Sequence, residues 1–126
     1  MIEKQNKEWE NRKGFAKELE KRTLKFVVSI IKLSARLPNT VESKVVRNQI
    51  TKSGTSIGAN YREANRSRSR ADFKNKIKIC ESEASETKYW LELIIETGWL
   101  DAAEINDECN ECSQLLALFS TIAKNC

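Results

Sequence analysis

The chain has 126 residues and a formal net charge of +4, with 40% hydrophobic residues, 32% charged residues, one proline and four glycines. A chain of this length forms one domain with its own core, and its composition is too apolar for a disordered protein and too poor in turn-forming residues for a sandwich of short strands. Histidine is absent, which excludes the histidine-based nucleophile pairs, zinc sites and di-iron sites of many enzymes.

No stretch approaches the roughly 20 uncharged apolar residues that a membrane-spanning helix needs. The N-terminal sequence MIEKQNKEWENRK also lacks the apolar segment of a signal peptide. We therefore expect a cytoplasmic protein without a membrane anchor. Residues 1–14 are interpreted as a charged N-terminal tail, and residues 15–126 as a single domain.

Four segments repeat apolar or small residues at alternating spacings of three and four, the pattern of helices packed in a bundle. The first helix is expected at 15–37, with a core stripe that runs from Leu19 to Leu37 and is widened by Leu24, Val27 and Ile31. Pro38 ends it, because the residue before a proline is disfavoured in helical geometry. Thr40 is the expected N-cap of a second helix at 40–66.

Ser69 and Asp72 form a capping-box pattern that opens a third helix at 69–97, and Asp101 and Glu104 form another that opens a fourth helix at 101–124. Gly98 lies between the third and the fourth helix, at a position where the C-terminus of a helix favours a residue with positive φ. The connections are short, so successive helices should be antiparallel neighbours. The predicted fold is all-α, an up-down-up-down antiparallel four-helix bundle.

The segment SGTSIGANYREANRSRSR, residues 53–70, has the composition of a flexible linker. However, the apolar stripe of the second helix passes through it without a change of phase, which places Gly54 and Gly58 inside the helix. Each interior glycine costs about 0.5 to 1 kcal/mol relative to alanine, so close packing against another helix or another copy is the expected compensation. Tyr61, one turn further on, is assigned to the same close-packing face. The linker interpretation is the alternative.

Charge is divided unevenly along the chain. Residues 38–78 hold ten basic and three acidic residues, whereas residues 79–126 hold two basic and ten acidic residues. Cations at the end of the second helix suit its dipole, but cations at the start of the third oppose its dipole unless an anion binds there. We therefore predict phosphate contacts from six residues: Arg62, Arg66, Arg68, Arg70, Lys74 and Lys78. Such binding would be governed by phosphates and sensitive to salt.

The other reactive side chains indicate no catalytic chemistry. All four cysteines, Cys80, Cys109, Cys112 and Cys126, fall on the core stripes and are interpreted as small core residues. The CNEC spacing at 109–112 is also that of a metal or redox pair, which is the alternative. The acidic residues of the third helix face no second carboxylate cluster and no histidine. We expect no catalytic residues, no metal and no cofactor.

The stretch SGTSIGANYREANRSRSRADFKNKIKICESEASETKYWLEL resembles the signature region of a known family. These are the small four-helix-bundle proteins encoded by intervening sequences of bacterial 23S ribosomal RNA genes, which are related to the accessory variability proteins of diversity-generating retroelements. The resemblance extends over about residues 20–123, and the matching positions in its most specific part are Ser53, Gly54, Ser56, Ile57, Asn60, Glu63, Ala64, Ser69, Asp72, Phe73, Ile79, Glu83, Glu86, Tyr89, Trp90 and Leu91. The four cysteines and the density of arginines at 62–70 depart from the family pattern.

The resemblance implies a ring-shaped homopentamer and no established catalytic activity. For the retroelement relatives it also implies binding of nucleic acid and of a reverse transcriptase. The first hypothesis is therefore a non-enzymatic, oligomeric bundle that binds RNA or DNA through the six cations. The second is a protein-interaction scaffold, in which the basic residues of one copy pair with the acidic third of a neighbouring copy and nucleic acid has no part.

Overall fold

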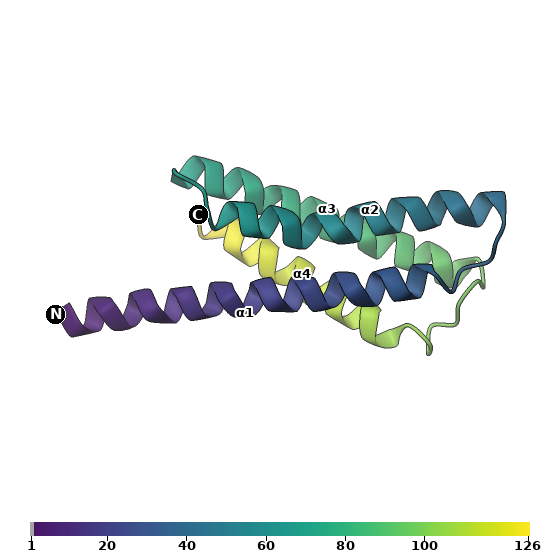
Figure 1. Cartoon of the computed structure of the whole chain (residues 1–126), viewed down its shortest axis with the longest axis horizontal. Coiled ribbons are helices and arrows are strands. Elements are labelled where there is room, and N and C mark those ends of the chain that lie inside the picture. The colour runs from purple at the N-terminus through teal and green to yellow at the C-terminus, as the bar shows by residue number, and fades with distance from the viewer. Residues whose placement is uncertain (1) are drawn as a thin grey trace.

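The structure is a computed structural model that describes residues 2–126, and only the backbone at residues 5 and 9. It consists of four helices, α1 (Ile2–Ser34), α2 (Val41–Ala64), α3 (Arg70–Glu96) and α4 (Asn106–Lys124). Successive helices run antiparallel and pack side by side, and α1 also packs against α4 (Figure 1). This confirms the predicted four-helix bundle. Within residues 2–126, no helix is long and apolar enough to cross a membrane.

The first helix begins much earlier than predicted. Residues 2–14 were expected as a tail, but α1 starts at Ile2 and projects beyond the other three helices (Figure 1); residue 1 of that tail lies outside the described residues. The charges of this segment account for the difference. Glu3 and Lys7 are four residues apart, as are Glu8 and Arg12, and a glutamate four residues before a cation stabilises a helix.

The fourth helix begins later than predicted. Instead of opening a helix, Asp101 and Glu104 close a turn: the Glu104 N–H donates to the Asp101 carbonyl oxygen over 3.0 Å, and the Asp101 N–H donates to Glu104 Oε2 over 3.3 Å. Helix α4 starts at Asn106, after the fully buried Ile105. Arg36 Nη2 lies 3.4 Å from Glu104 Oε2, so the glutamate ties this turn to the end of α1.

The other helix boundaries lie within three residues of the prediction, and their capping signals are confirmed. The hydroxyl oxygen of Thr40 accepts the Ser43 N–H, and that of Ser69 accepts the Asp72 N–H, each over 3.1 Å. Gly98 has φ +75°, the left-handed conformation that ends α3. Helix α1 ends at Ser34, three residues before the predicted end.

The predicted stripes meet in one core. Its largest fully buried side chains include Ile30, Leu33, Ile50, Ile57, Ile77, Leu91, Ile94, Leu115 and Phe119. A buried hydrogen bond crosses this core from α3 to α2, from Thr87 Oγ1 to Ser53 Oγ over 2.8 Å. Two residues predicted to widen the α1 stripe, Leu24 and Ile31, are instead 51% and 47% exposed, because they lie on the outer side of α1.

Helix α2 continues unbroken through its two glycines, as predicted, and α1 packs closely against it there. A Cβ atom added to Gly54 would lie 3.0 Å from Ile30 Cγ2, and one added to Gly58 would lie 3.0 Å from Thr23 Oγ1. Tyr61 is 2% exposed, and its ring packs edge to face against Phe119 at a centroid distance of 5.6 Å. In this structure, all three residues serve packing within the chain.

This contact can be tested by substitution at the glycines. Replacing Gly54 with leucine should lower the free energy of unfolding by about 1 to 3 kcal/mol, because the side chain would overpack the contact with Ile30. Gly14 has no atom within 4 Å of an added Cβ, so Gly14→Leu should be neutral or slightly stabilising through helix propensity. Urea denaturation of both variants measures the difference. Equal stability of the two variants would contradict the close approach of α1 and α2.

Candidate nucleic-acid interface

The predicted cations lie around one end of the bundle, where α2 passes into α3. This turn is compact: the Arg66 N–H donates to the Glu63 carbonyl oxygen and the Ser67 N–H donates to the Ala64 carbonyl oxygen, each over 3.0 Å. Ser69 then caps α3. Arg66 and Arg68 are therefore held on an ordered corner between two helices.

Arg62 faces α1 and is paired. Its Nε atom lies 3.6 Å from Glu20 Oε1, and the other oxygen of that carboxylate accepts a hydrogen bond from Asn65 Nδ2 over 2.9 Å. Glu20 thus neutralises part of the charge at the end of α2. The pairing of Glu20 with Arg62 could not be predicted from the sequence, since the two residues are 42 positions apart.

Lys76, which was not among the six predicted contacts, bridges α3 to α2. Its Nζ atom donates to Glu63 Oε2 over 2.9 Å, and this hydrogen bond raises the pKa of Lys76. The pair orients the start of α3 relative to the end of α2.

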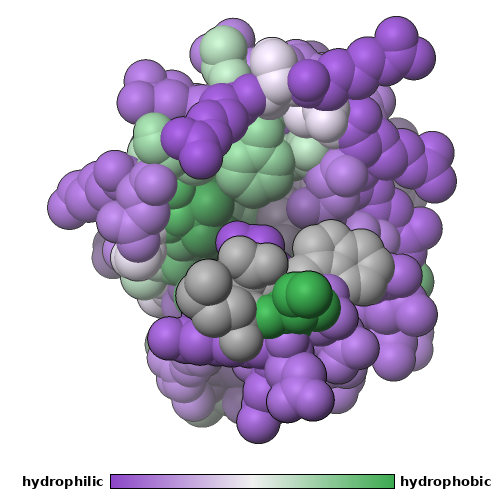
Figure 2. All heavy atoms as spheres, turned by 90° about the vertical axis from the view of Figure 1, so that its left-hand side faces the viewer, coloured by the Kyte–Doolittle hydropathy of each residue, from purple (hydrophilic) through white to green (hydrophobic). Residues whose placement is uncertain are grey.

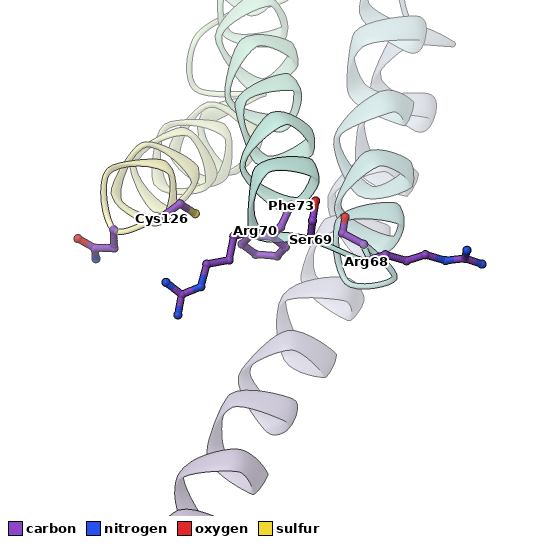
Figure 3. Close-up of a pocket in the computed structure, with 7 residues that line it drawn as sticks. Arg68, Ser69, Arg70, Phe73 and Cys126 are labelled. Atoms are coloured by element: carbon purple, nitrogen blue, oxygen red, sulfur yellow. The ribbon is translucent and has the colours of Figure 1, made fainter.

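The other five predicted cations are Arg66, Arg68, Arg70, Lys74 and Lys78, and none of them lies within 4.0 Å of a carboxylate in residues 2–126. They do not share one direction. Arg68 and Arg70 point away from each other on the two sides of Ser69 and Phe73 (Figure 3). Arg70, Lys74 and Lys78 follow one another at intervals of four along α3, and Lys78 borders a hollow shared with Leu116 of α4.

The corner cations border a hollow at the start of α3. Its volume is about 510 Å³, and it is lined by Ser67, Arg68, Ser69, Arg70, Phe73, Asn125 and Cys126. Figure 2 views this end of the molecule and shows apolar atoms in its middle with hydrophilic side chains around them. At the start of α3, the backbone N–H of Asp72 donates to the Ser69 hydroxyl oxygen, and the backbone N–H of Phe73 donates to the Ser69 carbonyl oxygen. The backbone N–H groups of Arg70 and Ala71 precede the first intrahelical bond and can donate to an anion.

A second group of cations was missed from the sequence. Lys44, Arg47 and Lys52 of α2 line a hollow of about 390 Å³ together with Ser34, Asn48 and Thr51. They lie in the first half of α2, far from the corner. No local run of charge marks them, and only the helical phase of α2, combined with the position of α1, brings them together.

The cysteines were expected in the core, and this is confirmed for two of them. Cys80 and Cys112 are fully buried, and their thiols donate to the carbonyl oxygens of Ile57 and Ala84 over 3.5 Å and 3.3 Å. Burial raises the pKa of each to about 12. Cys109 is half-buried and Cys126 is exposed, the latter because α4 ends at Lys124. Within residues 2–126, no three cysteine, aspartate or glutamate side chains are grouped to hold a metal ion.

Comparison with known proteins identifies relatives of the whole bundle. The family model described as 23S rRNA-intervening sequence protein matches residues 17–121. A crystal structure of a protein with unknown function from the S23 ribosomal protein family of Bacteroides thetaiotaomicron VPI-5482 is 42% identical in sequence, with a TM-score of 0.77. The match covers 83% of this chain and 97% of that chain. No curated protein matches the chain.

The buried thiols predict a loss of stability in alkali. An unfolded thiol ionises near pH 9.0, whereas Cys80 and Cys112 hold their protons to about pH 12 in the folded protein. Their contribution to stability is therefore present below pH 9 and is lost as the pH rises toward 12. We expect the Tm to fall over this range, and to fall less steeply in the double variant Cys80→Ala/Cys112→Ala. Parallel Tm curves for the two proteins would contradict the assigned burial.

Proposed function

The chain belongs to the 23S rRNA-intervening sequence protein family, and from this premise we propose that it is a non-enzymatic, oligomeric bundle that binds the phosphodiester backbone of RNA or DNA at the α2–α3 corner. One observation carries the proposal: Arg66, Arg68 and Arg70 lie at the first turn of α3, Lys74 and Lys78 follow along the next two turns, and none of the five has a carboxylate partner in the described chain. Cations at the N-terminus of a helix oppose its dipole, and a bound phosphate removes that conflict.

The geometry of the corner suits a phosphate chain better than a single small anion. Arg68 and Arg70 point to opposite sides of the α3 start (Figure 3), so they can contact successive phosphates but not one phosphate together. Lys74 and Lys78 extend the row from Arg70 by two turns of α3, or about 12 Å. Arg62 is a weaker contact than predicted, because Glu20 already pairs with it.

The proposal contains no catalytic step. The two buried thiols hold their protons to about pH 12, so neither supplies a thiolate nucleophile at neutral pH. No base-reading motif accompanies the arginines, and binding therefore depends on phosphate charge and falls with salt. By resemblance to its family, the proposed oligomer is a homopentamer, and by resemblance to the retroelement relatives its proposed protein partner is a reverse transcriptase.

The scaffold hypothesis requires the corner arginines to meet the acidic third of a neighbouring copy. The corner lies at one end of the bundle, whereas Glu92 and Glu96 lie in the last turns of α3, at the other end (Figure 1). Two copies placed side by side in the same orientation cannot bring these groups level. This separation excludes Glu92 and Glu96 as partners of the corner in that arrangement, but Glu81 and Glu83 lie close to Lys78 in the sequence of α3. The binding measurement below therefore has to separate the two hypotheses.

Binding can be measured by fluorescence anisotropy with a single-stranded RNA, a duplex RNA and a duplex DNA of equal length. The variant Arg66→Ala/Arg68→Ala/Arg70→Ala should bind at least tenfold more weakly at low salt. Its plot of log affinity against log salt should be less steep by about 2 to 3, since each phosphate contact contributes about 0.7 to 0.9. The matched control Lys17→Ala/Lys25→Ala/Lys32→Ala removes three exposed charges from α1 and should bind nearly as well as the wild type. Equal affinity of both variants would overturn the assignment of the corner.

A further inference from the structure

An aromatic ring lies in the corner hollow, and the proposed phosphate contacts do not use it. Phe73, in the first turn of α3, is half-buried and packs against the core. It also lines the hollow of about 510 Å³ at the start of α3. Figure 3 shows its ring at the tip of the helix, between Arg70 and Ser69. One part of the ring therefore closes the end of the core, and another part is open to a ligand.

The hollow combines this ring with cations and with neutral polar groups. Arg68 and Arg70 border it, and neither lies within 4.0 Å of a carboxylate in residues 2–126. Ser67 and Asn125 add a hydroxyl and an amide, which both donate and accept hydrogen bonds. The volume of the hollow lies within the range of about 300 to 1,000 Å³ that is typical of sites for small organic ligands. The hollow is therefore large enough for one nucleobase.

The two arginines lie on opposite sides of the ring. They point away from each other across Ser69 and Phe73 (Figure 3), so one phosphate cannot contact both of them. Two successive phosphates of a nucleic-acid strand can do so, and the sugar that joins these phosphates carries a base. A strand bound in this way can place that base in the space between the arginines, where Phe73 lies.

Only an unpaired base can enter the hollow. In a duplex, each base is hydrogen-bonded to its partner and stacked between its neighbours, and a protein that binds the backbone meets only phosphates and sugars. In a single strand, a base can leave the stack and lie on an aromatic side chain. Such stacking accepts every base, because each base has a π-face. The hollow therefore distinguishes single strands from duplexes without reading sequence.

We propose that the corner hollow receives an unpaired base of a single-stranded RNA or DNA, which stacks on Phe73 while Arg68 and Arg70 bind the phosphates on its two sides. The inference rests on the proposed function and specifies its ligand as a single strand. Phosphate contacts alone bind single strands and duplexes, so the aromatic ring supplies the selectivity for single strands. The phosphates supply the dependence on salt.

The test removes the aromatic face and keeps both the charge and the apolar packing of the corner. In fluorescence anisotropy, Phe73→Leu should bind single-stranded RNA and DNA at least about fivefold more weakly than the wild type, since the loss of one stacked base has an effect of this size or larger. Its affinity for a duplex of equal length should be unchanged. Its plot of log affinity against log salt should keep the wild-type slope, because no cation is removed. Phe73→Trp should bind single strands as tightly as the wild type or more tightly.

The matched control is Phe15→Leu. Phe15 is 50% exposed and lines a separate hollow between α1 and α4, so its substitution should leave the binding of both ligands unchanged. If Arg66→Ala/Arg68→Ala/Arg70→Ala weakens binding but Phe73→Leu binds single strands like the wild type, or loses equal affinity for duplexes, the base site is wrong and the phosphate site remains. If the arginine variant binds like the wild type, the proposed function is overturned as well.

A second measurement uses the unaltered protein and covers the case in which Phe73→Leu fails to fold. Its ligand is an abasic strand of the same length, which carries every phosphate and no base. The wild type should bind this strand at least about fivefold more weakly than the complete single strand, because the phosphate contacts remain and the stacking is lost. In a folded Phe73→Leu variant, most of this difference should disappear. Equal affinity of the wild type for the two strands would overturn the base site.

Discussion

The close contact between α1 and α2 is the constraint on which the rest of the structure depends. At Gly54 and Gly58, the absence of a side chain lets α1 approach until an added Cβ would lie 3.0 Å from its side chains. This contact keeps the glycine-containing segment helical, since two interior glycines would otherwise cost about 1 to 2 kcal/mol relative to alanine. Because α2 is unbroken, it places the α2–α3 corner at one end of the bundle and places Lys44 and Arg47 at the other end.

Much of the fold could be predicted because the core stripes are strictly periodic. Ile50, Ser53 and Ile57 keep helical phase across the glycines, and Thr40 and Ser69 are clear N-caps. Two boundaries were wrong for local reasons. Charge pairs such as Glu3 with Lys7 sustain a helix without an apolar stripe, and the Asp101–Glu104 pattern forms a turn that the buried Ile105 ends.

The candidate site was only partly visible in the sequence. The local run of cations located the corner, but pairing of Arg62 with Glu20, and the divergence of Arg68 and Arg70, depend on how helices from distant parts of the chain meet (Figure 3). The exposure of Leu24 and Ile31 was missed for a related reason. A helical stripe has no sequence signal that separates the apolar residues of the core from apolar residues at the surface of the chain.

The most direct measurement of the central claim is native-state hydrogen exchange of the α2 amides at residues 54–60. If α2 is one helix packed against α1, these amides should exchange only through global unfolding, with an opening free energy equal to that measured by urea denaturation. If residues 53–70 form a mobile tether, the same amides should exchange at nearly the rate of an unstructured peptide. That result would contradict both the packing of α1 on α2 and the position of the corner.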